Sequence, residues 1–131
     1  MRPSILAVDD EEDVTELVRF HLTRAGCDVR TASSGKAALQ AINAWRPDLL
    51  ILDLMLPDID GFGICELLRR QPATATLPVI ILSAWQSSDS RQLGLDLGAL
   101  AYITKPFRPR ELVQRVQSLL AERTEPPRPP S

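Results

Sequence analysis

Four short apolar runs of the sequence are each followed at once by polar residues. The runs are 5–8, 49–52, 79–82 and 101–104, and the residues that follow them are Asp9, Asp10, Asp53, Ser83 and Lys105. If the runs are parallel strands, their carboxyl ends meet at one edge of a sheet, where doubly wound folds bind ligands. A single aspartate there means little, because Asp is also a common helix cap. Polar groups after four such runs indicate a shared pocket.

The side chains of this pocket favour a particular chemistry. Carboxylates that lie close together repel, so either some of them are protonated or a cation lies among them. The available ligands are oxygen atoms, with no His or Cys nearby in the sequence, and this favours the hard ion Mg²⁺. A carboxylate beside a metal, a hydroxyl and a lysine is suited to forming an aspartyl phosphate, because the cations neutralise phosphoryl oxygens.

Helical segments are predicted between these runs, because apolar residues recur there at helical spacing. The sets are Leu17, Val18, Leu22 and Ala25; Ala37, Ala38, Ala41 and Ile42; Ile64, Leu67 and Leu68; Leu93, Leu95 and Leu97; and Leu112, Val113, Val116, Leu119 and Leu120. A weaker strand, 28–32, fits between the first two helices. Alternation of five strands with five helices predicts an α/β protein whose parallel sheet is covered by helices on both faces. The apolar runs are continuous, as in strands buried on both faces.

The composition bounds the class of protein. A chain of 131 residues accommodates one domain. A net charge of −2 gives no electrostatic basis for binding nucleic acid or an anionic membrane. We expect a cytoplasmic protein, because no signal peptide or membrane span is recognisable. Cys27 and Cys65 lack metal-site spacing and are expected to be buried thiols in a reducing compartment.

On these residues the sequence resembles the receiver domain of two-component response regulators, from about Ile5 to Leu120. The matching motifs are ILAVDDEEDV, LLILDLMLPDIDG, VIILSA and AYITKPF. The detailed pattern is most similar to receivers of the winged-helix transcription-factor subfamily. The resemblance implies a flavodoxin-like (βα)5 fold with strand order 2-1-3-4-5. It also implies a receiver domain over residues 1–123. The remainder, 124–131, has four prolines in its last six residues, which indicates a tail or the start of a linker.

The resemblance also assigns roles to the pocket residues. It implies that Asp53 accepts a phosphoryl group from a sensor histidine kinase. Mg²⁺ would be bound by Asp9, Asp10, Asp53 and the backbone carbonyl of Met55. Lys105 matches the lysine of the family's site, and the bond from Lys105 to the proline after it matches one that is usually cis.

A switch is implied as well. Ser83 matches the switch hydroxyl and Tyr102 the switch aromatic. Phosphorylation would draw Ser83 toward the phosphoryl group and let Tyr102 turn inward. The face formed by the fourth helix, the fifth strand and the fifth helix would then change its partner preference. The output would be a downstream effector protein or an effector domain missing from this chain, without direct nucleic-acid or membrane binding. Such a module is not an enzyme, apart from assisting its own phosphorylation and dephosphorylation.

Two features depart from the family pattern. Leu100 and Ala101 occupy positions that are commonly acidic, and Gln117 replaces the usual basic partner of Asp96. Because active dimers of the subfamily pair charges across this face, we expect at most a weak homodimer there. The second feature is Trp85, two residues after Ser83. It is either a plain surface aromatic or a bulky group that restricts water and lengthens the lifetime of the phosphoryl group.

Other classes share part of the pattern. A phosphatase of the haloacid dehalogenase type has a second Asp two positions after its nucleophile, where this chain has Met55. A flavodoxin-like electron carrier needs a Ser/Thr- and Gly-rich phosphate loop where this chain has the acidic sequence DDEED. A degenerate receiver that serves as a constitutive interaction module is the remaining alternative, against which the complete set of site residues argues.

Overall fold

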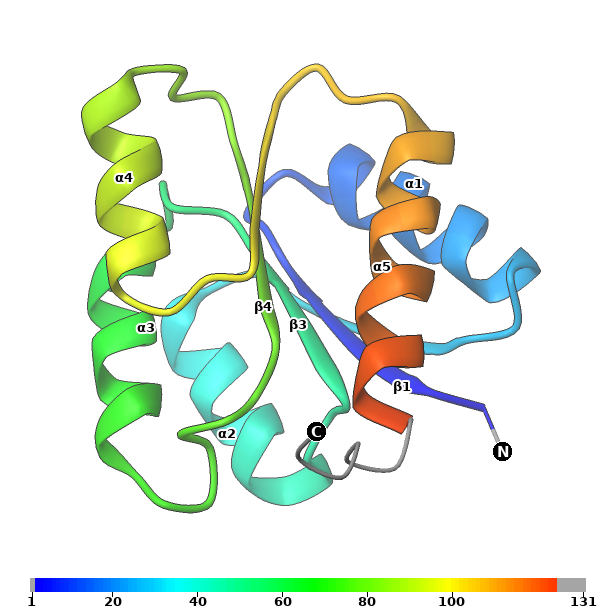
Figure 1. The fold of residues 1–131 in the computed structure, drawn as a ribbon, viewed down its shortest axis with the longest axis horizontal. Helices are drawn as coiled ribbons and strands as arrows, with labels where there is room; N and C mark the ends of the chain where they lie inside the picture. Colours follow the sequence, from blue (N-terminus) through cyan, green and yellow to red (C-terminus); the bar gives the residue numbers. More distant parts are fainter. Residues whose placement is uncertain (1, 125–131) are drawn as a thin grey trace, which may run out of the picture.

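The computed structural model describes residues 2–124 and shows one parallel sheet between two layers of helices (Figure 1). The strands are β1 (Ser4–Val8), β2 (Asp28–Ala32), β3 (Leu49–Leu52), β4 (Val79–Ser83) and β5 (Ala101–Thr104). The helices are α1 (Glu12–Arg24), α2 (Gly35–Trp45), α3 (Gly61–Arg70), α4 (Ser88–Asp96) and α5 (Pro109–Thr124). The strand order is β2-β1-β3-β4-β5. The predicted fold and strand order are confirmed. The predicted tail, 124–131, lies outside the described residues except for Thr124.

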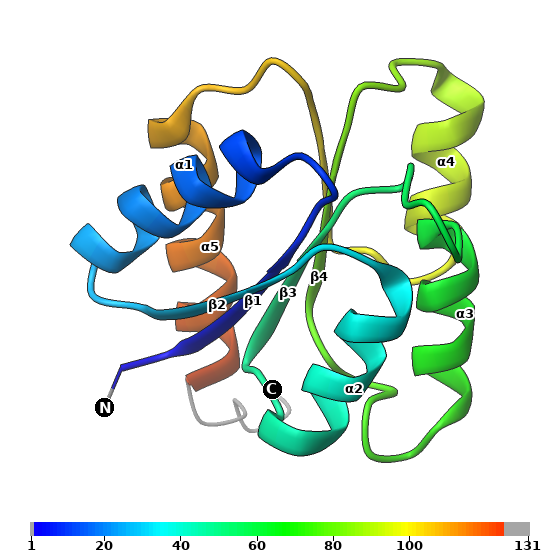
Figure 2. The ribbon, with the colours of Figure 1, turned by 180° about the vertical axis from the view of Figure 1, so that it is seen from behind.

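Successive residues of the central strands enter two separate cores. Leu50 and Leu52 of β3 face one hydrophobic cluster, and Leu49 and Ile51 face the other, because side chains alternate along a strand. Helices α2, α3 and α4 cover the first face, and α1 and α5 cover the second (Figures 1 and 2). Burial on both faces explains the continuous apolar runs of β1, β3 and β4. Strand β2 differs, because it lies at the edge of the sheet and buries only Ala32.

The helix boundaries are explained by residues that provide hydrogen-bond acceptors, or favourable charge, for the free backbone N–H groups of the first turn. Three helices begin with a side chain that accepts a hydrogen bond from the first turn: Ser34 for α2, Asp60 for α3 and Ser87 for α4. Helix α1 carries Glu12 and Asp13 in its first turn, where negative charge is favourable. It ends just before Gly26, whose φ of +97° is readily adopted only by glycine.

Helix α4 packs on the sheet through a glycine rather than through its leucines. Leu93 and Leu95 are 44% and 41% exposed, and the only buried residue of this helix is Gly94. A methyl group at Gly94 would lie 2.6 Å from Cδ1 of Ile81 and 3.4 Å from the ring of Tyr102. The predicted helix is confirmed, but it approaches the sheet through its backbone at Gly94, and Leu93 and Leu95 on either side of this glycine are turned toward solvent.

Arg69 joins three segments at the amino edge of the sheet. Its guanidinium, at the end of α3, donates hydrogen bonds to four backbone carbonyls, those of Thr74, Ala75, Leu77 and Gly98, at 3.0–3.3 Å. These carbonyls belong to the segment before β4 and to the turn between α4 and β5. One side chain thus connects α3 with the starts of β4 and β5.

Two further expectations concern the cysteines and membrane spans. Cys27 and Cys65 are buried free thiols, as predicted, and burial raises the pKa of Cys65 to about 11. Among residues 2–124, no helix has the length and apolar character needed to span a bilayer.

Candidate functional site

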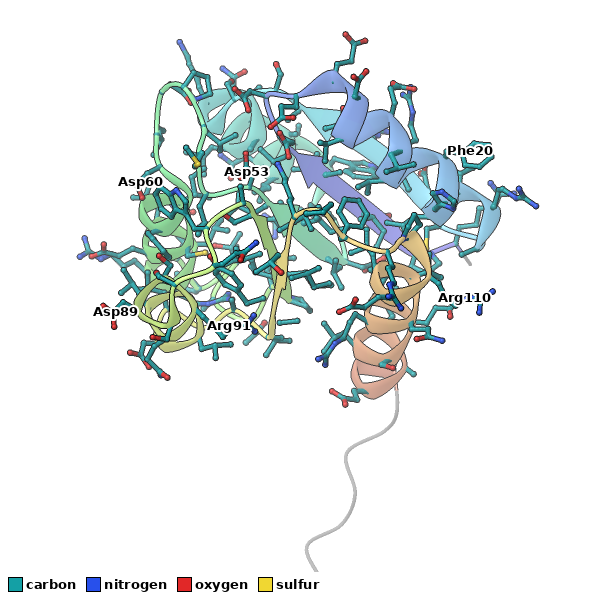
Figure 3. All side chains as sticks on the ribbon, turned by 90° about the horizontal axis from the view of Figure 1, so that it is seen from above. Phe20, Asp53, Asp60, Asp89, Arg91 and Arg110 are labelled. Atoms are coloured by element: carbon teal, nitrogen blue, oxygen red, sulfur yellow. The ribbon has the colours of Figure 1, made fainter. Side chains whose placement is uncertain are left out.

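The three predicted aspartates meet at the carboxyl edge of the sheet. Val8 pairs with Leu52 in the register of β1 and β3, so Asp9 and Asp53, the next residues, leave neighbouring strands side by side. Asp9, Asp10 and Asp53 each offer a carboxylate oxygen within 4.8 Å of the others. Figure 3 looks down on this edge and shows Asp53 between the two layers of helices. Asp9 and Asp53 are buried and Asp10 is exposed.

Lys105 reaches this cluster from the end of β5. Its Nζ lies 2.6 Å from Oδ2 of Asp9 and 3.7 Å from Oδ2 of Asp53. Its backbone N–H donates to the carbonyl of Ser83 at 2.8 Å, and the bond to Pro106 is cis, as predicted. One ammonium thus faces three carboxylates, so the site keeps an excess of negative charge.

The electrostatics of the site follow from burial and from this excess charge. Burial, followed by the neighbouring charge of Asp9, raises the pKa of Asp53, although Lys105 counteracts the shift. Burial alone would lower the pKa of Lys105, but the hydrogen bond to Asp9 and the charge of Asp53 outweigh it and raise that pKa. Lys105 is therefore a permanent cation at neutral pH.

The donor set fits a hard divalent cation. Its three carboxylates supply only oxygen ligands, as Mg²⁺ prefers, and a cation among them offsets their repulsion. Asp9 is oriented by the N–H of Glu11, which donates to its Oδ1 at 2.9 Å. Met55 lies beside the cluster, because its N–H donates to Oδ1 of Asp53 at 3.3 Å.

Ser83 and Tyr102, the predicted switch pair, are connected through the backbone of Trp85. The N–H of Trp85 donates to Oγ of Ser83 at 3.1 Å, and the hydroxyl of Tyr102 donates to the carbonyl of Trp85 at 2.8 Å. Both side chains of the pair are buried. The sequence indicated Trp85 because of its bulky side chain. It could not indicate these contacts, because they are made by the backbone N–H and carbonyl, which nearly every residue has.

The inward orientation of Tyr102 differs from the predicted resting arrangement. Its ring is already buried, and it packs beneath the guanidinium of Arg91, whose Cζ lies 5.1 Å from the ring centroid. Nη1 of Arg91 also donates to the carbonyl of Tyr102 at 3.3 Å, and Figure 3 shows this side chain between α4 and β5. In this conformation the Tyr102 ring already has the inward position that was predicted to follow phosphorylation.

Comparison with known proteins agrees with this geometry. The family model described as "Response regulator receiver domain" matches residues 5–117. The chain belongs to this family. Curated relatives of the receiver domain include the alkaline phosphatase synthesis transcriptional regulatory protein PhoP of Bacillus subtilis, 45% identical over 92% of this chain and 49% of that protein. The DNA-binding dual master transcriptional regulator RpaA of Synechocystis is 42% identical over 90% of this chain and 49% of that protein.

Solved structures of other response regulators are closely similar to this fold. The receiver domain of the Francisella response regulator 1452 has a TM-score of 0.87 at 36% identity, over 95% of this chain and 100% of that one. The chemotaxis response regulator CheY4 of Vibrio cholerae has a TM-score of 0.85 at 31% identity, over 91% and 99% of the two chains.

Family membership settles the general function. The chain is a receiver domain of the two-component type, a phosphorylation signalling module rather than an enzyme of the ordinary kind. Receiver domains generally use Mg²⁺ at an acidic pocket, and the cluster of Asp9, Asp10 and Asp53 is such a pocket. The chain spans about half the length of the curated relatives that it matches.

Proposed function

We propose that Asp53 accepts a phosphoryl group from a sensor histidine kinase, in a site formed with Asp9, Asp10 and Lys105. The observation that carries the proposal is the convergence of three carboxylates and one half-buried ammonium at the carboxyl ends of three strands. A structural ion pair would need one carboxylate for Lys105, whereas three carboxylates with one ammonium leave an excess of negative charge that favours binding of a further cation.

The proposed step is a displacement at phosphorus. An oxygen of the Asp53 carboxylate forms the new bond, the bond from phosphorus to the donor nitrogen breaks, and its electron pair stays on the donor imidazole. Lys105 lies 3.7 Å from Oδ2 of Asp53 and can donate to a phosphoryl oxygen attached there. Mg²⁺, bound by Asp9, Asp10, Asp53 and the carbonyl of Met55, would offset the charge of the carboxylates and phosphoryl oxygens.

Ser83 and Tyr102 would carry the signal toward the face formed by α4, β5 and α5. In this conformation Oγ of Ser83 accepts a hydrogen bond from the N–H of Trp85, and within residues 2–124 its hydroxyl proton has no acceptor. Ser83 can therefore donate to a phosphoryl oxygen on Asp53. Movement of Ser83 would displace Trp85, whose carbonyl holds Tyr102, so the switch would act through this backbone segment.

The test is phosphorylation by acetyl phosphate and Mg²⁺, followed by intact mass measurement. We expect one phosphoryl adduct on the unchanged protein and none on Asp53→Ala. If the unchanged protein gains no adduct, the alternative of a constitutive interaction module is favoured. An adduct that persists in Asp53→Ala would assign the acceptor to another residue.

The effector and the oligomeric state belong to the same proposal. We infer a receiver domain over 1–123 followed by a linker start at 124–131, which would lead to an effector domain or act beside an effector protein in the cytoplasm. The relatives' names as transcriptional regulators support this.

On the α4–β5–α5 face, Leu100 is 52% exposed and Ala101 is buried. Neither residue carries the charge that pairs across this face in active dimers of the subfamily, which supports at most a weak homodimer. Sedimentation with beryllofluoride should show mainly monomer, and a tight dimer would contradict this.

A further inference from the structure

The loop between β3 and α3 carries Met55, and its two ends are held differently from its tip. Leu54 is fully buried, and its carbonyl accepts the N–H of Gly61 at 2.9 Å. A methyl group at Gly61 would lie 2.7 Å from Cα of Leu54, so the two ends of the loop pack backbone against backbone. Met55 lies outside this junction and is 50% exposed. Its position therefore depends on what holds the outer part of the loop.

Asp58 fastens that outer part to a different element, helix α2. Its Oδ1 accepts the N–H of Gly35 at 2.8 Å, and its Oδ2 accepts the N–H of Lys36 at 2.8 Å. Oδ1 also accepts the N–H of Ile59 at 2.9 Å. Gly35 permits this contact, because a methyl group there would lie 2.9 Å from Cβ of Ile59. Asp60 caps α3 at the end of this loop, and within residues 2–124 the bonds to Gly35 and Lys36 are the only side-chain hydrogen bonds that join residues 55–60 to any other helix or strand.

The charge state of Asp58 agrees with this tether. The N–H groups of Lys36 and Gly35 lower the pKa of Asp58 below its ordinary value. At neutral pH the carboxylate is therefore ionised, and it faces the positive end of the α2 dipole. Both oxygens are used, so the side chain fixes the loop in direction as well as in distance.

Helix α2 is a firm base for this tether and stands beside the acidic cluster. Ala38 and Ile42 anchor the helix in the core. The strand before it ends at Ala32, whose carbonyl accepts the N–H of Asp9 at 3.1 Å. Asp58 thus connects the loop that carries Met55 with the segment that borders Asp9. The segment after β2 and the loop after β3 lie on either side of β1, so the sheet joins them only through that strand.

We propose that Asp58 is a positioning residue that holds the backbone of Met55 at the distance from Asp9 and Asp10 that metal binding requires. The inference rests on the proposed function, in which the carbonyl of Met55 is a metal ligand. Without the tether, the loop would keep its two ends but lose the restraint on Met55. The carboxylates would then bind the cation with one ligand poorly placed.

The experiment compares three variants by NMR titration with Mg²⁺ in the absence of phosphodonor. Asp58→Ala removes all three bonds, and we expect it to weaken Mg²⁺ binding by about tenfold, as loss of a supporting residue near a metal site does. Asp58→Asn keeps one acceptor oxygen for Gly35 and Ile59, and we expect a smaller loss. Ser34→Ala is the matched control, because it removes a cap from the same end of α2, at the N–H of Ala37, without touching the loop.

A second readout is amide hydrogen exchange of the metal-free protein. We expect faster exchange at Met55 and Ile59 in Asp58→Ala than in Ser34→Ala. Equal Mg²⁺ affinities of Asp58→Ala and the unchanged protein would overturn the inference, and so would equal losses in Asp58→Ala and Ser34→Ala. If the unchanged protein itself fails to bind Mg²⁺ and to form the adduct on Asp53, the proposed function fails instead.

Discussion

Replacement of Asp53 by Asn should make the metal-free protein more stable while abolishing its proposed function. Asn has almost the same shape, and its amide oxygen can still accept the N–H of Met55. The substitution removes one of three carboxylates whose oxygens lie within 4.8 Å of one another. It also removes the attraction between Asp53 and Lys105 at 3.7 Å. The balance of these two effects decides the outcome.

The distances allow this balance to be worked out. With an effective dielectric constant of about 20, two charges 4.8 Å apart interact by about 3.5 kcal/mol. Asp53 meets two such repulsions, whereas its attraction to Lys105 at 3.7 Å amounts to about 4.5 kcal/mol. Because Asp10 is exposed, solvent screens part of its repulsion. We therefore expect Asp53→Asn to raise the free energy of unfolding by about 1–2 kcal/mol.

Urea denaturation followed by circular dichroism measures this difference. The raised pKa of Asp53 sets its pH dependence: the folded state binds the proton more tightly than the unfolded state, whose pKa is near 3.8. The penalty of the charged carboxylate is thus fully present above the folded-state pKa. It is relieved as the pH falls toward 3.8, so the advantage of Asn should shrink there.

Mg²⁺ supplies the complementary measurement. The ion should stabilise the unchanged protein more than Asp53→Asn, because the variant has lost one charged ligand. A variant that is less stable than the unchanged protein in metal-free buffer at neutral pH would refute the reasoning. It would show that the pair with Lys105 outweighs the repulsion among the carboxylates.

Three other substitutions test features of the packing and of the site. Gly94→Ala should lower the free energy of unfolding by about 1–2 kcal/mol, because its methyl group would lie 2.6 Å from Ile81; a gain in urea denaturation, as helix propensity alone predicts, would mean that α4 shifts freely. Arg69→Met should cost about 2–3 kcal/mol through loss of hydrogen bonds to carbonyls, and unchanged stability would contradict its connecting role. Trp85→Ala should accelerate phosphate release from the phosphorylated protein several-fold if the indole restricts water, and an unchanged rate would reject that role.

The strands and much of the site could be predicted because they depend on patterns within short stretches of sequence. The buried strands appear as continuous apolar runs, since a parallel sheet covered on both faces excludes polar residues from its interior. The parallel arrangement then places Asp9, Asp53 and Lys105 at one edge without further information. Residue type and position along a strand were sufficient for this part of the site.

Helix α4 shows where local signals fail. Leucines mark this segment as a helix, but Leu93 and Leu95 are largely exposed and Gly94 between them faces the sheet. Hydrophobic periodicity identifies the helix but not its rotation, because close approach of its backbone to Ile81 is a property of the neighbouring strand. The same limit applies to Tyr102, whose inward position depends on the carbonyl of Trp85.

The element order, the carboxylates at the strand ends and the chemistry that those groups favour all follow from the order of residues along the chain. Only the folded chain shows which groups bind one another: Lys105 binds Asp9 across 96 residues, Asp58 binds the first turn of α2, and Arg69 binds four carbonyls. Elements and strand-end residues can be predicted because periodicity and residue type are properties of the sequence. Backbone donors and acceptors are the same at nearly every residue, so only packing selects the ones that become partners.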